Sequence, residues 1–501
     1  MVSPVPDLDN LTWDHVRDPI YDYIFFNKEI EERIINNIVL QRLRFIRQLQ
    51  LAHLVYPGAD HTRFQHSLGV MHVAGLMASA IIDKLVKNYG SEGLDGYKPE
   101  QLIEAVRLAG LLHDIGHGPF GHAFEEAILW DNKELSKIGL NNHERIGSKI
   151  YEILGLEEEI NKLGEKYGLG EIGTLTKEIL AQKPPRARVL RLLRKVVKAW
   201  LYPADIIDFL LRDSYYTGTR EYGYIDYNRL IMNTYPCQKD NEYVLVLDRK
   251  ALGALRIYLY SREYMYEHVY YHPVNRAFNK TLVTALRYGD EYFGLSEAVY
   301  RISEGDPSLF LKLTDAKIYT KLMESINDPS APKEVKEAAR ILIHERKSPW
   351  KRVGDDLRIP LLRGPHDPLL LLLRFRDIVE KDFQDYVSRQ LNIRYGIDPK
   401  DVWVDSSILH PAPLPSITQI TRIYISRAVK NKITWLKELN VISFMAREGI
   451  SPKIIIRLYV NREAYKKVSL TRNIDEEALT ILEEALNKIV AGNESISEIT
   501  L

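Results

Sequence analysis

Cysteine is almost absent from this chain of 501 residues, in which Cys237 stands alone. A single thiol excludes an internal disulfide and any zinc site built from several cysteines. One thiol in a chain of this length is typical of a reducing compartment. The first 20 residues hold neither an apolar run nor an early basic cluster, so we expect no targeting segment and a cytoplasmic protein.

Net charge and long apolar runs are lacking too. The 68 lysines and arginines balance 68 aspartates and glutamates, which excludes a surface built throughout to coat nucleic acid or an anionic membrane. The densest apolar run, at 368–374, is much shorter than the ~18 apolar residues that a membrane-spanning helix needs. With 45% apolar residues, the composition is that of a soluble protein with a large core and no membrane partner.

Helical periodicity dominates the first two thirds of the chain. Apolar residues recur at helical spacing in the segments 28–160, 176–216, 255–292 and 296–345. Proline is tolerated in the first turn of a helix, so Pro203 fits the start of a helix that includes Asp205. We therefore predict a helical domain over residues 1–345.

The character of the sequence changes near residue 346. Helix-breaking residues stand at 346–349 and 363–366, and the prolines of 410–415 predict an extended linker. Beyond the linker, β-branched and aromatic residues predict strands at 418–426 and 453–460, and a helical pattern covers 474–490. The fold class that follows is mainly α, with a smaller C-terminal α+β region over residues 346–501.

Histidine is the most informative residue type, because several of the 14 histidines fall in two short stretches, 61–66 and 112–122. His113 and Asp114 follow an apolar helical segment and precede Gly116, so we expect the pair at a helix end, where side chains can converge. Imidazole nitrogen and carboxylate oxygen are ligands for a divalent ion of the Mn, Fe, Ni or Zn kind. An open position on such an ion can activate water or polarise a phosphoryl oxygen.

Two further ligands would have to come from elsewhere in the chain. His66 lies on a helix predicted to begin around Phe64, and Asp205 lies in the first turn of an apolar helix, with Asp208 on the same face. The ordinary alternatives are a helix-capping role for Asp205 and a buried, hydrogen-bonded His66. For any lone histidine or aspartate, those alternatives are the more common outcome.

Taken together, these residues resemble a known family. His66, the pair His113 and Asp114, and Asp205 follow the order H…HD…D of the HD-domain metal-dependent phosphohydrolases. The stretches that resemble the deoxynucleoside triphosphate triphosphohydrolases of the SAM-and-HD-domain group, without the SAM domain, are 41–49, 56–69, 113–122 and 205–213. The resemblance runs from about Asp18 to about residue 280, and it implies an HD-domain helical bundle as the core.

The resemblance also implies a reaction. A divalent ion (Mn, Fe, Ni, Zn or Mg) would be held by four residues: His66, His113, Asp114 and Asp205. Metal-activated water would attack the α-phosphorus of a deoxynucleoside triphosphate and release the deoxynucleoside and triphosphate. His117 and His143 match the catalytic histidines of the family, and Glu125 takes the place of the carboxylate that orients one of them. A histidine held in this way can protonate the departing 5′ oxygen.

Four more residues match positions that contact the substrate in the family. Arg63, His122 and Asp213 would line the nucleotide site, and Gln48 would contact the 3′-hydroxyl of the sugar. The planar guanidinium of Arg63 suits a phosphate. A surface ion pair for Arg63 and an ordinary polar helix position for Gln48 are the alternatives.

The pattern departs from the family at two phosphate contacts. Where relatives carry a lysine and a tyrosine, this chain has Ile206 and Phe209. Each lost charge-assisted contact typically costs ~1.5–3 kcal/mol. Either another cation substitutes, from the candidates Arg212, Arg220 and Arg276, or the substrate differs.

The regulatory guanine-nucleotide site of the animal enzymes also departs from the family pattern. Asn36 and Asp14 stand where the family has an aspartate and a lysine. We therefore expect no strict activation by dGTP.

Two alternative functions stay open on the sequence alone. One is an HD phosphohydrolase acting on another nucleotide, such as a monophosphate, a cyclic nucleotide or a signalling nucleotide. The other is a nucleic-acid-binding protein that retains the fold, because the run 183–198 holds seven cations and no acid. A solvated helix face is the ordinary explanation of that run. By analogy with the family, we expect a homo-oligomer, either a dimer or a tetramer.

Overall fold

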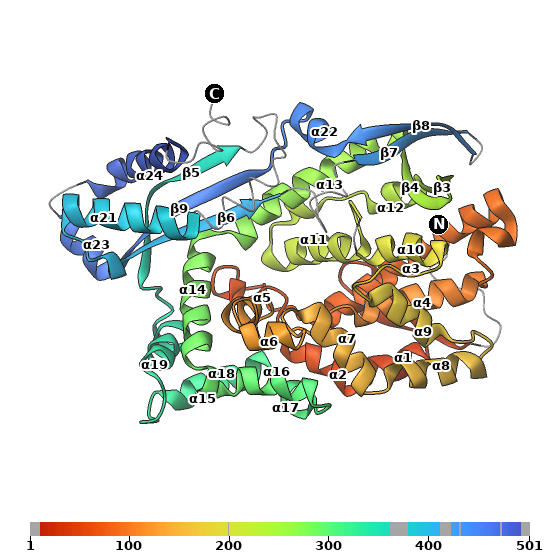
Figure 1. Cartoon of the computed structure of the whole chain (residues 1–501), viewed down its shortest axis with the longest axis horizontal. Coiled ribbons are helices and arrows are strands. Elements are labelled where there is room, and N and C mark those ends of the chain that lie inside the picture. The colour runs from red at the N-terminus through yellow and green to blue at the C-terminus, as the bar shows by residue number, and fades with distance from the viewer. Residues whose placement is uncertain are drawn as a thin grey trace.

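The computed structural model describes residues 11–198, 200–360, 379–410, 422–429, 432–470 and 473–491. The fold is mainly α, as the sequence predicts, and its centre is the long helix α3 (Arg63–Tyr89). Helices α4 (Pro99–Leu112) and α11 (Ala204–Thr217) pack on α3 in the body of the molecule (Figure 1). Among the residues described, the other helices of seven or more residues are α7 (His143–Ile153), α8 (Leu156–Lys166), α9 (Ile172–Leu180), α10 (Arg188–Val197), α13 (Leu252–Tyr264), α14 (Pro273–Tyr288), α16 (Leu295–Ser303), α18 (Asp315–Ser325), α19 (Lys333–Ala339), α21 (Gln384–Tyr395), α22 (Val441–Arg447), α23 (Arg462–Ser469) and α24 (Ile474–Ala491).

Two glycines let these three central helices approach closely. A Cβ atom at Gly69 of α3 would lie 1.8 Å from Oδ1 of Asp208 on α11. A Cβ atom at Gly110 of α4 would lie 3.0 Å from the carbonyl oxygen of Val70 on α3. Side chains larger than hydrogen would therefore separate the helices that carry the predicted ligands.

Helix α3 lies between two apolar cores. Phe64, Leu68 and Met71 pack into one core, whereas Val73 and Met77 pack into the other. Burial on both sides explains why α3 is so apolar. Together with the turn that follows it, at Arg63–Leu94, it is the one segment of the described residues that is long and apolar enough to span a membrane, with a mean hydropathy of 1.5. In this structure, 78% of its most apolar window is buried inside the protein, as in a core helix.

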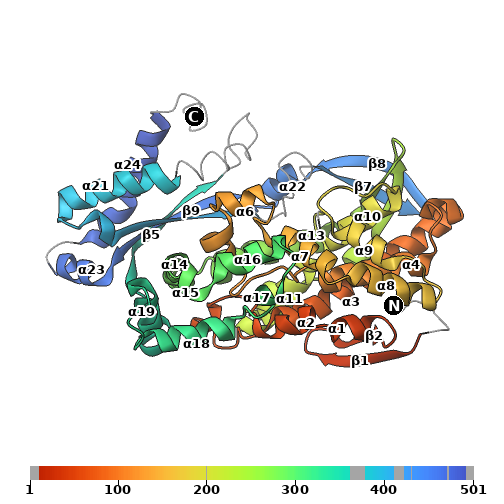
Figure 2. The same ribbon diagram turned by 60° about the horizontal axis from the view of Figure 1, so that its bottom comes forward.

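Strands occur where the periodicity did not predict them. β1 (Trp13–Asp18) and β2 (Asp22–Asn27) form an antiparallel hairpin at an edge of the helical body (Figure 2). A four-stranded sheet has the order β3-β4-β7-β8, from β3 (Thr234–Lys239), β4 (Glu242–Asp248), β7 (Arg422–Val429) and β8 (Lys432–Asn440). β4 and β7 run parallel, so this sheet joins segments from both sides of residue 345. The predicted domain boundary at that residue stays a prediction.

The C-terminal region is α+β, as predicted. β9 (Lys453–Asn461) lies between β5 (Trp350–Pro360) and β6 (Val402–Leu409) in an antiparallel sheet, and α21 and α24 contribute to its apolar core. The predicted strand at 453–460 and the helix at 474–490 are confirmed, and residues 422–426 of the predicted strand at 418–426 lie in β7. The helix-breaking residues at 363–366, the apolar run at 368–374 and all but His410 of the linker lie outside the described residues.

A buried ion pair and a hydrogen bond fix α4 to the short helix α1 (Glu31–Ile35) and to the N-terminal hairpin. Arg107 of α4 is fully buried, and it donates to both carboxylate oxygens of Glu31 at 2.6 and 2.9 Å and to the carbonyl of Phe25 at 2.7 Å. Removing one partner of a buried pair leaves the other charge without compensation.

We predict that Arg107→Met lowers the free energy of unfolding by about 3–5 kcal/mol, measured by urea denaturation. Lys87→Met is the matched control, because Lys87 pairs with Asp83 on the surface, where both side chains are more than half exposed. That control should cost less than about 1 kcal/mol. Equal losses in the two variants would contradict the account.

Candidate active site

The ends of three helices bring the four predicted ligands together. His66 lies in the first turn of α3, His113 and Asp114 follow α4 directly, and Asp205 lies in the first turn of α11. Nε2 of His66 lies 3.1 Å from Oδ1 of Asp205 and 4.0 Å from Oδ2 of Asp114. Nε2 of His113 lies 3.7 Å from the same Asp205 oxygen and 3.2 Å from Oδ1 of Asp114. The four residues therefore enclose one small space.

Hydrogen bonds on the far side of each imidazole set its tautomer. Nδ1 of His66 lies 2.8 Å from Oδ2 of Asp208, and Nδ1 of His113 lies 2.7 Å from the carbonyl oxygen of Gly110. When Nδ1 carries the proton, the lone pair of Nε2 is left free to bind a metal. Nε2 of His113 is buried and has no hydrogen-bond partner in the part of the chain that the structure describes. An unsatisfied buried nitrogen aimed at two carboxylates is what a metal site without its ion would contain.

The electrostatics of this cluster also suit a cation. Although burial opposes a charge there, the hydrogen bonds to Asp205 and Asp208 raise the pKa of His66 to about 10. Burial likewise opposes ionisation of Asp114, but His113 and Arg63 hold its pKa well below the usual value. A divalent ion would take the place of the proton shared by His66 and Asp205. The side chain of Asp205 is 33% exposed, so water and substrate can reach this side of the site.

A chain of buried charges supports His66. Asp208 is bound by Arg212 at 2.9 Å, and Arg212 in turn binds Asp18 of β1 at 2.7 Å. The same bonds to Arg212 and His66 lower the pKa of Asp208 to about 2, although burial opposes this shift. Sequence reasoning placed Asp208 on the face of Asp205, but it did not identify Asp208 as the residue that orients His66.

The predicted catalytic histidines gather around one carboxylate. Oε1 of Glu125 lies 2.6 Å from Nδ1 of His143, 3.3 Å from Nδ1 of His117 and 3.5 Å from Nδ1 of His122. The rings of His117 and His143 are stacked, with centroids 3.8 Å apart. Nε2 of His117 lies 3.4 Å from Oδ1 of Asp114, which joins this group to the predicted metal ligands.

The two stacked histidines differ in basicity. Burial, together with the charges of Arg63 and His143, lowers the pKa of His117 to about 4. Burial also disfavours a charge on His143, but its hydrogen bond to Glu125 raises the pKa of His143 above the usual value. His117 is therefore neutral near pH 7, whereas His143 keeps its proton to a higher pH than an ordinary histidine and can thus carry a proton to be donated.

The four predicted substrate contacts lie in different environments. Arg63 is buried and donates to Asp114 at 2.6 Å. His122 lies at the rim, where its side chain is 60% exposed. Oε1 of Gln48 is buried and has no partner. Asp213 accepts hydrogen bonds from His61 and from the hydroxyl of Tyr270, each at 2.7 Å. None of these contacts tests the assignment to substrate, which stays a prediction.

Two of the three candidate replacement cations are already engaged. Arg212 is fully buried between Asp208 and Asp18, and Arg276 pairs with Asp405 at 2.5 Å. Arg220 lies over the ring of Tyr215, 4.6 Å from its centroid. Arg212 and Arg276 therefore already have acidic partners within the protein, and a role for any of the three in holding phosphate stays a prediction.

Arg262 of α13 is a cation that sequence reasoning missed. Its side chain is buried, and Nη1 has no hydrogen-bond partner. The remaining nitrogens contact the carbonyl oxygen of His410 at 3.3 Å and the hydroxyl of Tyr266 at 3.4 Å, neither of which carries a full negative charge. Its charge also acts on Tyr270, whose hydroxyl binds Asp213 in the candidate site.

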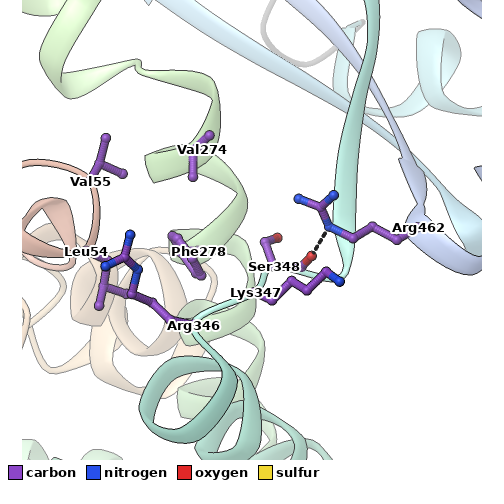
Figure 3. Close-up of a pocket in the computed structure, with 8 residues that line it drawn as sticks. All are labelled: Leu54, Val55, Val274, Phe278, Arg346, Lys347, Ser348 and Arg462. Carbon is purple, nitrogen blue, oxygen red and sulfur yellow. Dashed lines mark hydrogen bonds between the residues drawn. The ribbon is translucent and has the colours of Figure 1, made fainter.

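A separate pocket of about 230 Å³ lies where the helical body meets the C-terminal sheet (Figure 3). Its lining residues are Leu54, Val55, Val274, Phe278, Arg346, Lys347, Ser348 and Arg462. Arg462 donates to the carbonyl of Ser348 at 2.6 Å, drawn as a dashed line. None of the four predicted metal ligands lines this pocket.

Comparison with known proteins agrees with this geometry. A family model described as HD domain matches residues 63–198, and one described as HD associated region matches residues 225–333. The chain therefore carries an HD domain followed by its associated region. His66, His113 and Asp114 lie inside the first match, and Asp205 lies between the two matches.

Several curated proteins are similar over much of the chain. The uncharacterized protein YwfO of Bacillus subtilis is 32% identical over 62% of this chain and 64% of its own length. The deoxynucleoside triphosphate triphosphohydrolase SAMHD1 of Gallus gallus is 30% identical over 68% of this chain and 55% of its own length. SAMHD1 of Homo sapiens is 28% identical over 77% of this chain and 63% of its own length. The chain thus spans less than two thirds of each of these relatives.

We predict that Asp208→Asn weakens the binding of Mn²⁺ about 10-fold to 100-fold, because the amide no longer fixes the His66 tautomer. His113→Ala should abolish tight binding. Equilibrium dialysis followed by metal analysis measures both effects. The control is His15→Ala, which alters an exposed histidine of β1 and should bind Mn²⁺ like the wild type. Unchanged affinity in His113→Ala would refute this ligand set.

Proposed function

We propose that this protein is a metal-dependent phosphohydrolase that acts on nucleotides. One observation carries the proposal: the Nε2 atoms of His66 and His113 face the carboxylates of Asp114 and Asp205, while His143 is stacked on His117, which itself contacts Asp114. Nitrogen and oxygen donors with room for water suit Mn, Fe, Ni, Zn or Mg. The HD-domain match supports the same class of reaction.

The side chains divide the work of hydrolysis. A divalent ion held by the four ligands would lower the pKa of water and polarise a phosphoryl oxygen. Arg63 neutralises part of the acidic charge around Asp114 and orients that carboxylate. Glu125 holds His143 by its Nδ1 atom, so that the other ring nitrogen can deliver a proton to the leaving oxygen. His117 stays neutral and fixes the plane of the His143 ring by stacking.

We infer further that the substrate is a deoxynucleoside triphosphate, cleaved to the deoxynucleoside and triphosphate. The resemblance of the motifs and the named activity of the SAMHD1 relatives support this substrate. Ile206 and Phe209 leave two phosphate contacts of those enzymes unfilled. We propose that Arg262 supplies the missing charge, because it is a buried guanidinium that has no acidic partner among the described residues and whose charge acts on Tyr270.

Two other functions remain as alternatives. The absence of the lysine and the tyrosine also suits a smaller nucleotide, such as a monophosphate, a cyclic nucleotide or a signalling nucleotide. Nucleic-acid binding through 183–198 has less support, because cations of α10 bind their own chain. Arg188 pairs with Asp95, Arg191 pairs with Glu242, and Arg194 donates to two carbonyl oxygens. The homo-oligomer and the cytoplasmic location stay predictions.

Incubation with Mn²⁺ and each deoxynucleoside triphosphate tests the function. We expect deoxynucleoside and intact triphosphate as the products, separated by ion-exchange chromatography. His113→Ala should lower the rate by at least about 10³-fold, because a metal ligand is lost. A nucleoside monophosphate as the product would refute the triphosphohydrolase reaction but not the phosphohydrolase class. Full activity of His113→Ala would refute both.

The role of Arg262 is tested by Arg262→Met. Loss of a charge-assisted phosphate contact should raise KM about 10-fold to 100-fold and leave metal affinity unchanged. Arg301→Met is the control, because Arg301 is an exposed residue of α16 that pairs with Glu297. A variant that changes thermal stability but not KM would show that Arg262 serves only the packing of the tyrosines.

A further inference from the structure

A buried carboxylate of the HD-associated region reaches two segments beside the candidate site. Asp315 is the first residue of α18, and its side chain is only 2% exposed. Oδ1 accepts the backbone N–H of Phe120 at 2.7 Å, and Oδ2 accepts the backbone N–H of Arg47 at 3.0 Å. Both partners are distant in the sequence, so Asp315 joins three parts of the chain at one point.

The first of these segments carries catalytic candidates. Phe120 lies between His117 and His122, and its φ of +57° is in the left-handed region that a bulky side chain seldom adopts. Such a conformation persists only where surrounding contacts hold it. The hydrogen bond to Asp315 is one such contact. It therefore helps to set the backbone conformation that orients His117 and His122.

The second segment carries the candidate sugar contact. Arg47 precedes Gln48, whose backbone N–H donates to the carbonyl of His61 at 3.0 Å. The N–H of Arg63 donates to the carbonyl of Ile46 at 2.9 Å, so this segment is also tied to the start of α3. Asp315 thus links Gln48 to the turn that carries His117 and His122.

The next turn of α18 contacts the same two segments. The rings of Tyr319 and Phe120 pack edge to face, with centroids 5.3 Å apart. The guanidinium of Arg47 lies 5.6 Å from the centroid of the Tyr319 ring. The hydroxyl of Tyr319 lies 3.4 Å from Nε2 of His53. One face of α18 therefore holds both segments through two residues spaced four apart.

The arginine side chains near Asp315 bind other partners. Arg47 pairs with Asp60, Arg63 pairs with Asp114, and Arg42 donates to the carbonyl of Leu313. Burial raises the pKa of Asp315 to about 6, against the effects of its two hydrogen bonds and of nearby arginines. Burial is unfavourable for a carboxylate, yet both oxygens of Asp315 accept backbone N–H groups there. Such a side chain is well suited to fix the distance between Phe120 and Arg47.

We propose that Asp315 is a positioning residue, which holds the turn with His117 and His122 at a fixed distance from the segment with Gln48. The HD-associated region would then set the geometry between the catalytic histidines and the sugar side of the site. The catalytic part of this inference rests on the proposed function.

Asp315→Asn tests the proposal, because an amide has a single oxygen acceptor and turns its NH₂ group toward the other N–H donor. We expect kcat to fall at least about 10-fold with unchanged Mn²⁺ affinity, since a misplacement on the order of 1 Å can cost ~10²-fold in rate. Backbone amide exchange, followed by mass spectrometry, should become faster in peptides covering 45–49 and 117–124.

Thr314→Ala is the matched control. Thr314 caps the same helix by accepting the N–H of Lys317 at 3.3 Å, so its loss weakens α18 without removing either bond of Asp315. We expect the control to keep the wild-type kcat and the wild-type exchange of both segments. If both variants lower kcat equally at equal loss of thermal stability, Asp315 has only a structural role and the proposal fails.

The exchange measurement distinguishes failure of the proposed function from failure of the proposed role of Asp315. If the wild type hydrolyses no nucleotide, the proposed function fails, and unchanged exchange in Asp315→Asn would separately overturn the link between the segments. If Asp315→Asn does not fold, Tyr319→Leu takes its place and should speed exchange in the same peptides. Exchange that is unchanged there would also overturn the proposal.

Discussion

Nδ1 of His66 is hydrogen-bonded to the Asp208 carboxylate, and Nδ1 of His113 is hydrogen-bonded to the Gly110 carbonyl. Both lone pairs are therefore left on Nε2, and both Nε2 atoms face the carboxylate of Asp205. This constraint brings the residues of the proposed metal centre together although they lie far apart in the sequence. It also depends on close helix packing, because Gly69 and Gly110 are the positions where α3 can approach α11 and α4.

Support for the site extends outward in buried charges. Arg212 connects Asp208 to Asp18 of the N-terminal hairpin, and Arg63 connects Asp114 to the start of α3. Each carboxylate near the centre has a partner, so the negative charge needed for a cation is held without an unpaired buried acid. Beside the predicted catalytic histidines, Glu125 contacts imidazoles, whereas Asp315 has no ionic partner among the described residues and accepts backbone N–H groups instead. The site is thus positioned by the HD domain and by the region that follows it.

Local sequence patterns predicted the helices and the residues at their ends, because periodicity, proline and glycine act over a few residues. His113 at the end of α4 and Asp205 at the start of α11 follow from such signals. The pairing of β4 with β7 could not be predicted, since it joins residues about 180 apart whose contacts leave no local trace. The ion pair between Arg276 and Asp405 could not be predicted for the same reason, because the two residues lie 129 positions apart. Arg262 and Asp315 were missed because burial and the absence of an ionic partner are properties of the fold.

The central claim is that two imidazole Nε2 atoms bind one divalent ion. Electron spin echo spectroscopy of the Mn²⁺-loaded protein tests it directly, because ¹⁴N couplings report imidazoles bound to the ion. We predict couplings from two imidazoles in the wild type and from one in His66→Ala, provided that this variant retains the ion. The described residues contain two further groups that could hold an ion. One is formed by Asp114, His117 and His143, and the other by His122, Glu125 and His143. Couplings that persist unchanged in a variant lacking both His66 and His113 would place the ion in one of these other groups and contradict the account.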